Sequence, residues 1–376
     1  MKKKGRIVQL IVTLEQGGCE MMLLKILPLL REDFEHTIIT LRQKGPVAPR
    51  FEASGIRVIS LNQKNFFDFT SYRRLRKILQ TLKPDLIITN LLHADIIGRF
   101  YLRNFLSCQI VSYIGTTYNS PRYWLAQLFE KCSKYFADGY IANAFSVKET
   151  YVRKFGVPEQ RISVIPNGID TNEFNEASPP EEVRTSLNIS PDDFVITCVA
   201  NLHVNKGHAY LLEAFEHLFT RSSLCEKKLK LLLIGDGPER KNIEKQIAVY
   251  RSKSHIHLLG RRLDISDLLK SSTVFVLPTF FEGMSNALLE AMSCSLPVIT
   301  TDIPENREII THNQTGILCP TKDIGCLARS IERLLQDNNL SQSLGTAARS
   351  HIKKHYDLLP IANRFREAFI SLISKE

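Results

Sequence analysis

The sequence predicts an α/β protein made of two Rossmann-like doubly wound domains, each built on a parallel sheet, with a ligand cleft between them. Short buried strands alternate with amphipathic helices along the whole chain, and a polar, proline-containing stretch interrupts this alternation near the middle. A length of 376 residues also exceeds what one hydrophobic core usually serves. We place an N-terminal domain at 1–172, a C-terminal domain at 173–358 and a closing helix at 359–376, which we expect to pack back toward the N-terminal domain.

The first half repeats a strand, a turn and a helix. Its first strand is the apolar run from Ile7 to Leu14, and the glycine turn Gly17-Gly18 leads into a helix from Glu20 to Leu30. A basic helix from Tyr72 to Leu82 is stopped by Pro84. The other predicted strands are 36–41, 56–61, 85–90, 109–113 and 139–142, and the other predicted helices are 93–103, 123–136 and 146–155.

The second half begins after a short linker at about 173–182. Its last strand–helix–strand unit joins a buried strand at 274–277, which Pro278 ends, to a helix from Asn286 with Ser285 as its N-cap. Such right-handed crossovers bind ligands outside the carboxyl ends of their strands. The other predicted strands are 194–202, 230–234, 255–259 and 295–302, and the other predicted helices are 210–219, 240–250, 265–270, 325–336, 341–356 and 359–374.

Composition is that of a soluble globular protein, with 44% apolar and 23% charged residues. The net charge of +10 favours an anionic partner, which composition alone leaves open among a nucleotide diphosphate, a membrane surface and nucleic acid. The eight cysteines show no metal-binding spacing, so we expect reduced thiols and a cytoplasmic protein. The apolar run after Lys4 is short and lacks a cleavage site, which favours a buried strand over a signal peptide.

Four features converge on a nucleotide diphosphate. Gly17-Gly18 frees backbone amides at a helix N-terminus, and Lys206 places a point charge in a loop that follows a strand. The loop EGMSN adds backbone donors at the start of the next helix. Glu282 in that loop and Glu290 in the helix lie eight residues apart, so at about 100° per residue they face different parts of a ligand, and Glu290 suits a ribose diol.

These motifs together resemble a known family. Gly17-Gly18, PNGID at 166–170, NLHVNKGH at 201–208, LLLIGDGPE at 231–239 and EGMSNALLEAM at 282–292 occur in the order found in the retaining glycosyltransferases of family 4, which have the GT-B fold. The resemblance covers nearly the whole chain and is strongest from 199 to 320. It implies a sugar transfer from a nucleotide-diphosphate sugar, with a UDP-sugar favoured, to a glycan or lipid-linked acceptor in polysaccharide or glycoconjugate biosynthesis.

The resemblance also implies a role for each matching residue. Glu282 corresponds to the glutamate near the transferred sugar, where it positions the donor for front-face attack by the acceptor, and Glu290 corresponds to the one that holds the ribose. Lys206 meets the diphosphate, and the backbone of Gly283, Met284 and Ser285 lines the sugar and phosphates. The remaining implied contacts are Arg262 in the nucleobase loop, Gly17 and Gly18 at the diphosphate, and His93 facing the reacting sugar.

The chain departs from the family pattern at three places. Asn201 replaces a phosphate-binding arginine, and either His203 or an arginine elsewhere is left to compensate. Ser295 replaces a glycine after the EAM helix, and Pro304-Glu305 replaces a glycine pair, although Glu308 keeps the acidic position of that loop. No D-x-D motif occurs in the chain, so we expect no required metal cofactor, with Lys206 and the helix N-terminus in its place.

Aromatic residues stand beside basic ones at 65–77 and in a second stretch that includes Tyr123, Trp124, Phe129, Lys131 and Lys134. Two interpretations remain open: contact with an anionic membrane at its inner face, or ordinary core and solvated surface. The alternatives to a transferase are a nucleotide-sugar epimerase of the same architecture and a basic nucleic-acid-binding protein. Because the basic residues are dispersed and no reading motif occurs, we expect no nucleic-acid partner.

Overall fold

The structure is a computed structural model, and it describes residues 4–15, 17–65, 67–116, 124–174, 180–221 and 229–374. The chain forms two compact units, one of residues 1–168 with 358–376 and the other of residues 169–357. The sequence places the second domain's start at 173. In the structure the second unit starts at Ile169, because Ile169 forms a parallel bridge with Asp357 and its amide donates to Tyr356. Tyr123, Cys225 and residues 175–179 of the expected linker lie outside the described residues.

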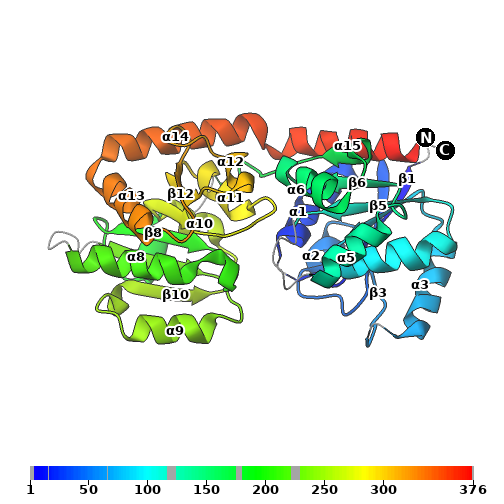
Figure 1. The fold of residues 1–376 in the computed structure, drawn as a ribbon, viewed down its shortest axis with the longest axis horizontal. Coiled ribbons are helices and arrows are strands. Elements are labelled where there is room, and N and C mark those ends of the chain that lie inside the picture. Colours follow the sequence, from blue (N-terminus) through cyan, green and yellow to red (C-terminus); the bar gives the residue numbers. More distant parts are fainter. Residues whose placement is uncertain are drawn as a thin grey trace. The chain divides into compact units, whose positions relative to one another are not determined.

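The first unit contains a seven-stranded sheet in the order β3-β2-β1-β4-β5-β6-β7, and every neighbouring pair is parallel (Figure 1). This is the doubly wound order, in which the chain reverses its direction of growth between β1 and β4. The strands are β1 Gly5–Ile11, β2 Phe34–Thr40, β3 Arg57–Ser60, β4 Leu86–Asn90, β5 Gln109–Ile114, β6 Gly139–Ala142 and β7 Ile162–Val164.

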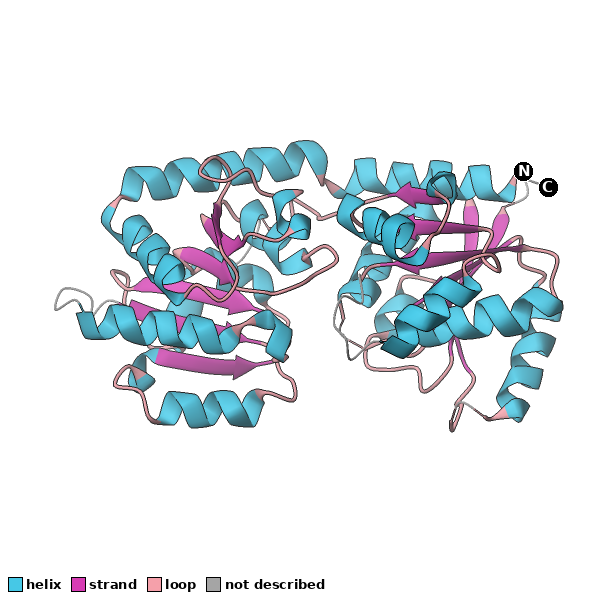
Figure 2. Ribbon diagram, in the orientation of Figure 1, coloured by secondary structure: helices cyan, strands magenta, loops and turns pink. Residues whose placement is uncertain are grey.

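Helices cover both faces of this sheet (Figure 2). They are α1 Gly18–Ile26, α2 Ala48–Ala53, α3 Phe69–Leu82, α4 Leu92–Ile96, α5 Trp124–Ser133, α6 Phe145–Thr150 and α15 Leu358–Ile373. One core packs α1, α2 and α15 on one face, and a second core packs α3 with the segment 92–102 on the other. The predicted helix 20–30 is α1 followed by a 3-10 turn at Leu27–Leu30, since Pro28 cannot donate an amide hydrogen bond.

The C-terminal helix α15 belongs to the first unit. Ile361, Phe365 and Phe369 are buried in its core, where the Phe369 ring lies 5.7 Å from that of Phe34. The Arg366 side chain also forms an ion pair of 2.7 Å with Asp33. The helix therefore completes a core formed by much earlier parts of the chain, and its Arg366–Asp33 pair joins residues 333 positions apart.

The second unit repeats the same topology with six parallel strands in the order β10-β9-β8-β11-β12-β13. The direction in which successive strands are added to this sheet reverses between β8 and β11. The strands are β8 Phe194–Val199, β9 Leu229–Ile234, β10 Ile256–Gly260, β11 Val274–Leu277, β12 Val298–Thr301 and β13 Ile317–Cys319. The helices are α7 Pro180–Ser186, α8 His208–Arg221, α9 Arg240–Ala248, α10 Ile265–Lys270, α11 Asn286–Ser293, α12 Pro304–Arg307, α13 Ile324–Gln336 and α14 Asn338–His355.

The two sheets confirm the predicted fold class of two parallel-sheet, Rossmann-like domains. Strands β7 and β13 were not predicted from the sequence. Both are three-residue strands at the edges of their sheets and are too short to show a hydrophobic pattern. Among the described residues no helix has the length and apolarity that crossing a bilayer requires, and the seven described cysteines are free.

Candidate active site

An ion pair between Lys206 and Glu282 joins the two central loops of the second unit. Lys206 Nζ donates to Glu282 Oε1, and the two side chains are only 20% and 10% exposed. Lys206 lies in the loop after β8 and Glu282 in the loop after β11, so both stand at the carboxyl ends of the two strands between which the sheet reverses. Ligands of doubly wound sheets bind at this position. The structure thus brings together a cation and a carboxylate that lie 76 residues apart in the chain.

Backbone contacts hold these two loops against each other. The Phe280 amide donates to the Asn205 carbonyl at 2.7 Å, and the Thr279 hydroxyl donates to the same oxygen at 3.0 Å. Gly207 has a φ of 70°, and a Cβ atom built there would lie 2.0 Å from the Pro278 oxygen. Only glycine fits this position, because it tolerates the left-handed conformation and leaves room for the neighbouring backbone.

A third loop, GDGPE, packs on the other side of the lysine loop. The Leu202 amide donates to Asp236 at 3.1 Å, and the Glu239 amide donates back to Leu202 at 3.0 Å. A Cβ atom at Gly235 or Gly237 would lie 2.0 Å from the Ala200 oxygen or 2.5 Å from the Leu202 oxygen. The glycines of this motif therefore permit close loop packing, and they support the loop that carries Lys206.

Helix α11 begins directly after the glutamate loop. Ser285 caps it, as the sequence predicts, since its hydroxyl accepts a hydrogen bond from the Leu288 amide at 3.3 Å. Gly283, Met284 and Ser285 are buried between Glu282 and the helix, and Glu290 is half-buried within it. The helix thus presents its N-terminus, which favours negative charge, next to the ion pair.

The loop after β12 adds a third carboxyl group beside this site. Thr301 donates its hydroxyl to the Thr279 carbonyl, and Asn306 donates to the Thr301 carbonyl at 2.9 Å, which ties the start of α12 to the glutamate loop. Glu305 is buried here. Its burial, and then the charges of Glu282 and Glu308, raise its pKa to about 7. The Pro304-Glu305 departure therefore places the Glu305 carboxyl group beside the Lys206–Glu282 pair. This carboxyl group is close to half-protonated at neutral pH.

The remaining expected residues of the second unit lie in exposed or partly exposed positions. Arg262 pairs with Asp264, an interaction that lowers the pKa of that aspartate. Asn201 and His203 are exposed in the lysine loop. Ser295 has a φ of 59°, which explains why a glycine is usual at this position.

His208 is a buried residue that the sequence reasoning did not single out, although it stands beside Lys206 in the NLHVNKGH motif. Neither ring nitrogen has a hydrogen-bond partner among the described residues. Burial, and then the charges of Lys206 and His203, lower its pKa to about 4, so the ring is neutral at physiological pH.

In the first unit the expected residues also follow the strands where the sheet reverses. Gly17 and Gly18 follow β1, with Gly17 as the N-cap of α1, and His93 lies in α4 after β4. A Cβ atom at Gly17 would lie 2.5 Å from a carboxylate oxygen of Glu20, whose pKa is raised to about 7 chiefly by burial. Burial, and then the charge of Arg42, lower the pKa of His93.

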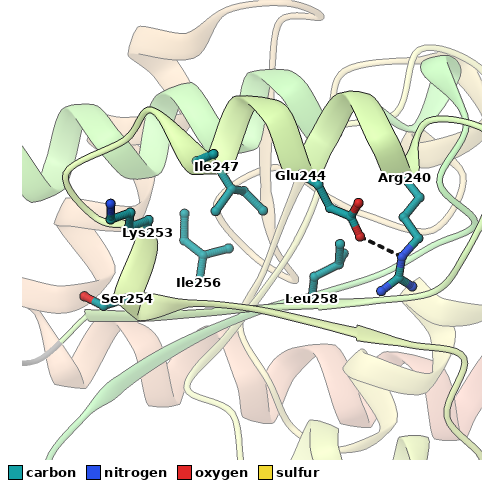
Figure 3. Close-up of a pocket in the computed structure, with 8 residues that line it drawn as sticks. Arg240, Glu244, Ile247, Lys253, Ser254, Ile256 and Leu258 are labelled. Carbon is teal, nitrogen blue, oxygen red and sulfur yellow. Dashed lines mark hydrogen bonds and ion pairs between the residues drawn. The ribbon is translucent and has the colours of Figure 1, made fainter.

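A shallow groove of 640 Å³ lies apart from these residues, between α9 and the edge strand β10 (Figure 3). Ile247, Ile256 and Leu258 give it an apolar floor, and Arg240 pairs with Glu244 at 2.9 Å along its rim. None of the expected site residues lines it. Within the described part of the chain, no group of three or more His, Cys, Asp or Glu residues is arranged to hold a metal ion.

Comparison with protein families covers both units. Residues 180–351 match the family model described as glycosyl transferases group 1, and residues 16–173 match that of glycosyltransferase family 4. The chain belongs to the family 4 glycosyltransferases. This family 4 glycosyltransferase has the GT-B fold.

Relatives of this glycosyltransferase include bacterial enzymes. It is 26% identical over 353 residues to the UDP-Gal:α-D-GlcNAc-diphosphoundecaprenol α-1,3-galactosyltransferase of Escherichia coli, a match that covers 91% of this chain and 90% of that protein. It is also 26% identical to the capsular polysaccharide biosynthesis glycosyltransferase CapM of Staphylococcus aureus, with 62% of each chain covered. Among solved structures, Anabaena Alr3699/HepE in complex with UDP and glucose superposes with a TM-score of 0.87 at 21% identity, covering 98% of this chain and 100% of that one.

Proposed function

We propose that this glycosyltransferase moves a sugar from a UDP-sugar to a lipid-linked or glycan acceptor, with retention of the anomeric configuration. The observation that carries the proposal is the Lys206–Glu282 pair at the reversal point of the second sheet. It places a cation suited to the diphosphate and a carboxylate suited to sugar hydroxyls within one hydrogen bond of each other. The galactosyltransferase relative, whose name specifies UDP-Gal and a diphosphoundecaprenol acceptor, supports the same donor and acceptor classes.

In this proposal the second unit binds the donor. Lys206 neutralises charge on the leaving diphosphate, and the amides at the start of α11 add donors there without a metal ion. Glu282 holds the transferred sugar, while Glu290 accepts hydrogen bonds from the ribose hydroxyls. The backbone of Gly283, Met284 and Ser285 lines the donor, and the loop of Arg262 and the Asn201 position border it.

The first unit binds the acceptor in this proposal. Gly17 and Gly18 approach the donor diphosphate with backbone amides, and His93 faces the reacting sugar. The neutral state of His93 that its lowered pKa favours suits a hydrogen-bond acceptor for a sugar hydroxyl. A lipid-linked acceptor would bring the protein to the inner face of the membrane.

A donor screen tests the proposal. The protein is heated with UDP-glucose, UDP-galactose, UDP-N-acetylglucosamine, GDP-mannose and ADP-glucose, each in turn. A ligand at about 100 times its Kd adds about 2.7 kcal/mol of stability, which raises the Tm of a domain of this size by roughly 5–10 °C. Stabilisation by GDP or ADP sugars alone would contradict the UDP assignment.

The reaction is then followed with the stabilising donor. Retention predicts that the product keeps the anomeric configuration of the donor sugar, which proton NMR coupling constants report. Conversion of the donor without any acceptor would instead show an epimerase. If EDTA abolishes turnover and manganese restores it, the metal-free mechanism is wrong.

A further inference from the structure

Helix α5 of the first unit turns its polar side inward. Glu130 and Ser133 are fully buried, and both accept hydrogen bonds from Nη1 of the buried Arg99, at 2.6 Å and 2.9 Å. Arg99 also donates to Ser112 of β5 at 3.0 Å. The charged network therefore anchors the polar side of α5 against the sheet.

The apolar side of α5 faces outward. Trp124, Leu125 and Leu128 are 61%, 62% and 52% exposed, and their spacing places them on neighbouring positions of one helix surface. Helices that pack on a core normally bury such a stripe and expose their polar side. The reversed arrangement indicates that a partner outside this unit covers α5.

The exposed apolar surface continues onto the neighbouring segments. The Phe100 ring lies 5.4 Å from Phe129 of α5 and 5.3 Å from the exposed Phe136, and the ring of the exposed Phe105 lies 5.0 Å from that of Tyr101, with their planes tilted by 58°. We call this surface the aromatic face. It consists of Phe100, Phe105, Trp124, Leu125, Leu128 and Phe136.

Positive charge accompanies the aromatic face. The Arg76 guanidinium of α3 lies 4.3 Å from the Phe105 ring centre, and Lys131 is exposed on α5 itself. Lys134 follows directly after the last residue of α5, with its ammonium 5.1 Å from the Tyr135 ring. Long basic side chains can cover apolar surface with their methylene groups while the charged ends stay in water.

The two units also differ in formal charge, and the unit that carries the aromatic face is the positive one. The first unit has 28 Lys and Arg against 15 Asp and Glu, a formal charge of +13. The second has 21 against 24, a charge of −3. All the excess positive charge therefore belongs to the unit that carries the aromatic face.

We infer that the aromatic face is a docking surface for an anionic lipid bilayer. Aromatic rings and leucines enter the boundary between headgroups and acyl chains, while Arg76, Lys131 and Lys134 meet lipid phosphates. A second copy of the chain fits less well, because face-to-face packing would oppose two strongly positive units. The inference deepens the proposed lipid-linked acceptor, but its test does not depend on catalysis.

Vesicle flotation tests this surface with the full chain. Vesicles of phosphatidylcholine alone are compared with vesicles that contain phosphatidylglycerol, at low and at high salt. We expect flotation with the anionic vesicles and its reduction by salt, since the attraction is partly electrostatic. The protein staying at the bottom of the gradient with anionic vesicles at low salt would overturn the inference.

Variants locate the contact. Leu125→Gln with Leu128→Gln is expected to lower the vesicle partition coefficient at least about tenfold, because the variant loses the free energy of transferring two leucine side chains from water to the bilayer. The matched control is Val249→Gln with Leu263→Gln, which changes two residues of the second unit that are 80% and 83% exposed. Equal partitioning of the two pairs of variants would refute the assignment to α5.

A second pair of variants tests the charges. Lys131→Ala with Lys134→Ala is expected to weaken binding about fivefold for each cation removed, whereas Lys241→Ala with Lys245→Ala on the second unit should change little. Light scattering measures the oligomeric state of both proteins. If the unmodified chain is a dimer and the Leu125→Gln, Leu128→Gln protein is a monomer, a second copy of the chain covers the aromatic face and the bilayer inference is wrong. Stabilisation by UDP, measured without vesicles, separates this outcome from failure of the proposed function.

Discussion

Replacing Gly207 by alanine tests the packing that holds Lys206 against Glu282. The new Cβ atom would lie 2.0 Å from the Pro278 oxygen and 3.0 Å from its carbonyl carbon, so backbone must move. The left-handed φ of 70° costs a non-glycine residue about 1–2 kcal/mol, and relief of the clash costs about 1–3 kcal/mol more. We therefore expect the free energy of unfolding of the second unit to fall by about 2–5 kcal/mol.

Gly260→Ala provides the matched control. Gly260 also has a positive φ, of 66°, but the nearest atom to its Cβ position is the end of the flexible Arg240 side chain at 3.5 Å. Its cost should be the conformational term alone, about 1–2 kcal/mol. The difference between the two variants isolates the clash with Pro278.

Thermal unfolding and steady-state kinetics measure the outcome. Since a change of 1 kcal/mol shifts the Tm of a domain of this size by about 2–4 °C, Gly207→Ala should melt several degrees below Gly260→Ala. Displacement of Pro278 also moves the loop of Glu282, and a misplacement of about 1 Å can cost about 100-fold in rate. Equal Tm and equal kcat/KM for the two variants would refute the packing argument.

Three further changes test the other parts of the site and its support. Glu282→Gln should chiefly lower kcat and Glu290→Ala should chiefly raise the donor KM, by about 10–100-fold for a lost charge-assisted hydrogen bond; initial-rate kinetics giving the reverse pattern would undo the two roles. Arg99→Met should destabilise the first unit by about 3–5 kcal/mol because it leaves buried carboxylates unpaired, whereas Arg103→Met, which breaks a more exposed pair, should cost less than about 1 kcal/mol in urea unfolding. Glu305 has a folded-state pKa of about 7, above the usual 4.5, so its contribution to stability is present below pH 4.5 and is lost as the pH rises to about 7; Glu305→Gln should therefore gain up to about 3 kcal/mol over the unmodified chain at pH 8 and little at pH 4, and an equal gain at both pH values would contradict the shift.

Much of the fold could be predicted from the chain because its buried parallel strands are continuous apolar runs. The strands around Ile88 and Val276, for example, have no polar alternation to obscure them. Edge strands such as the one at Ile317 are too short for this signal. The Ser285 cap was equally visible, because a hydroxyl before a run of helix formers has few other uses.

The site was less visible from the chain. Lys206 and Glu282 were each recognisable from their loops, but Glu305 and His208 were not assigned roles, since a carboxyl or imidazole group gains its unusual pKa only from burial. The outward orientation of the leucines of α5 could not be predicted from the sequence either. Their spacing indicates an amphipathic helix and does not say which side meets the core.

The sequence by itself therefore determined the kinds of groups and the turns that hold them: a lysine before a glycine, a glutamate before a capped helix, and glycines where backbone must pass closely. Tertiary structure decided which of these groups meet. Sheet order places the loops after β8 and β11 side by side although Lys206 and Glu282 are far apart in the chain. Contacts of this range depend on strand pairing and on the sum of many weak packing terms, and no local pattern of residues contains them.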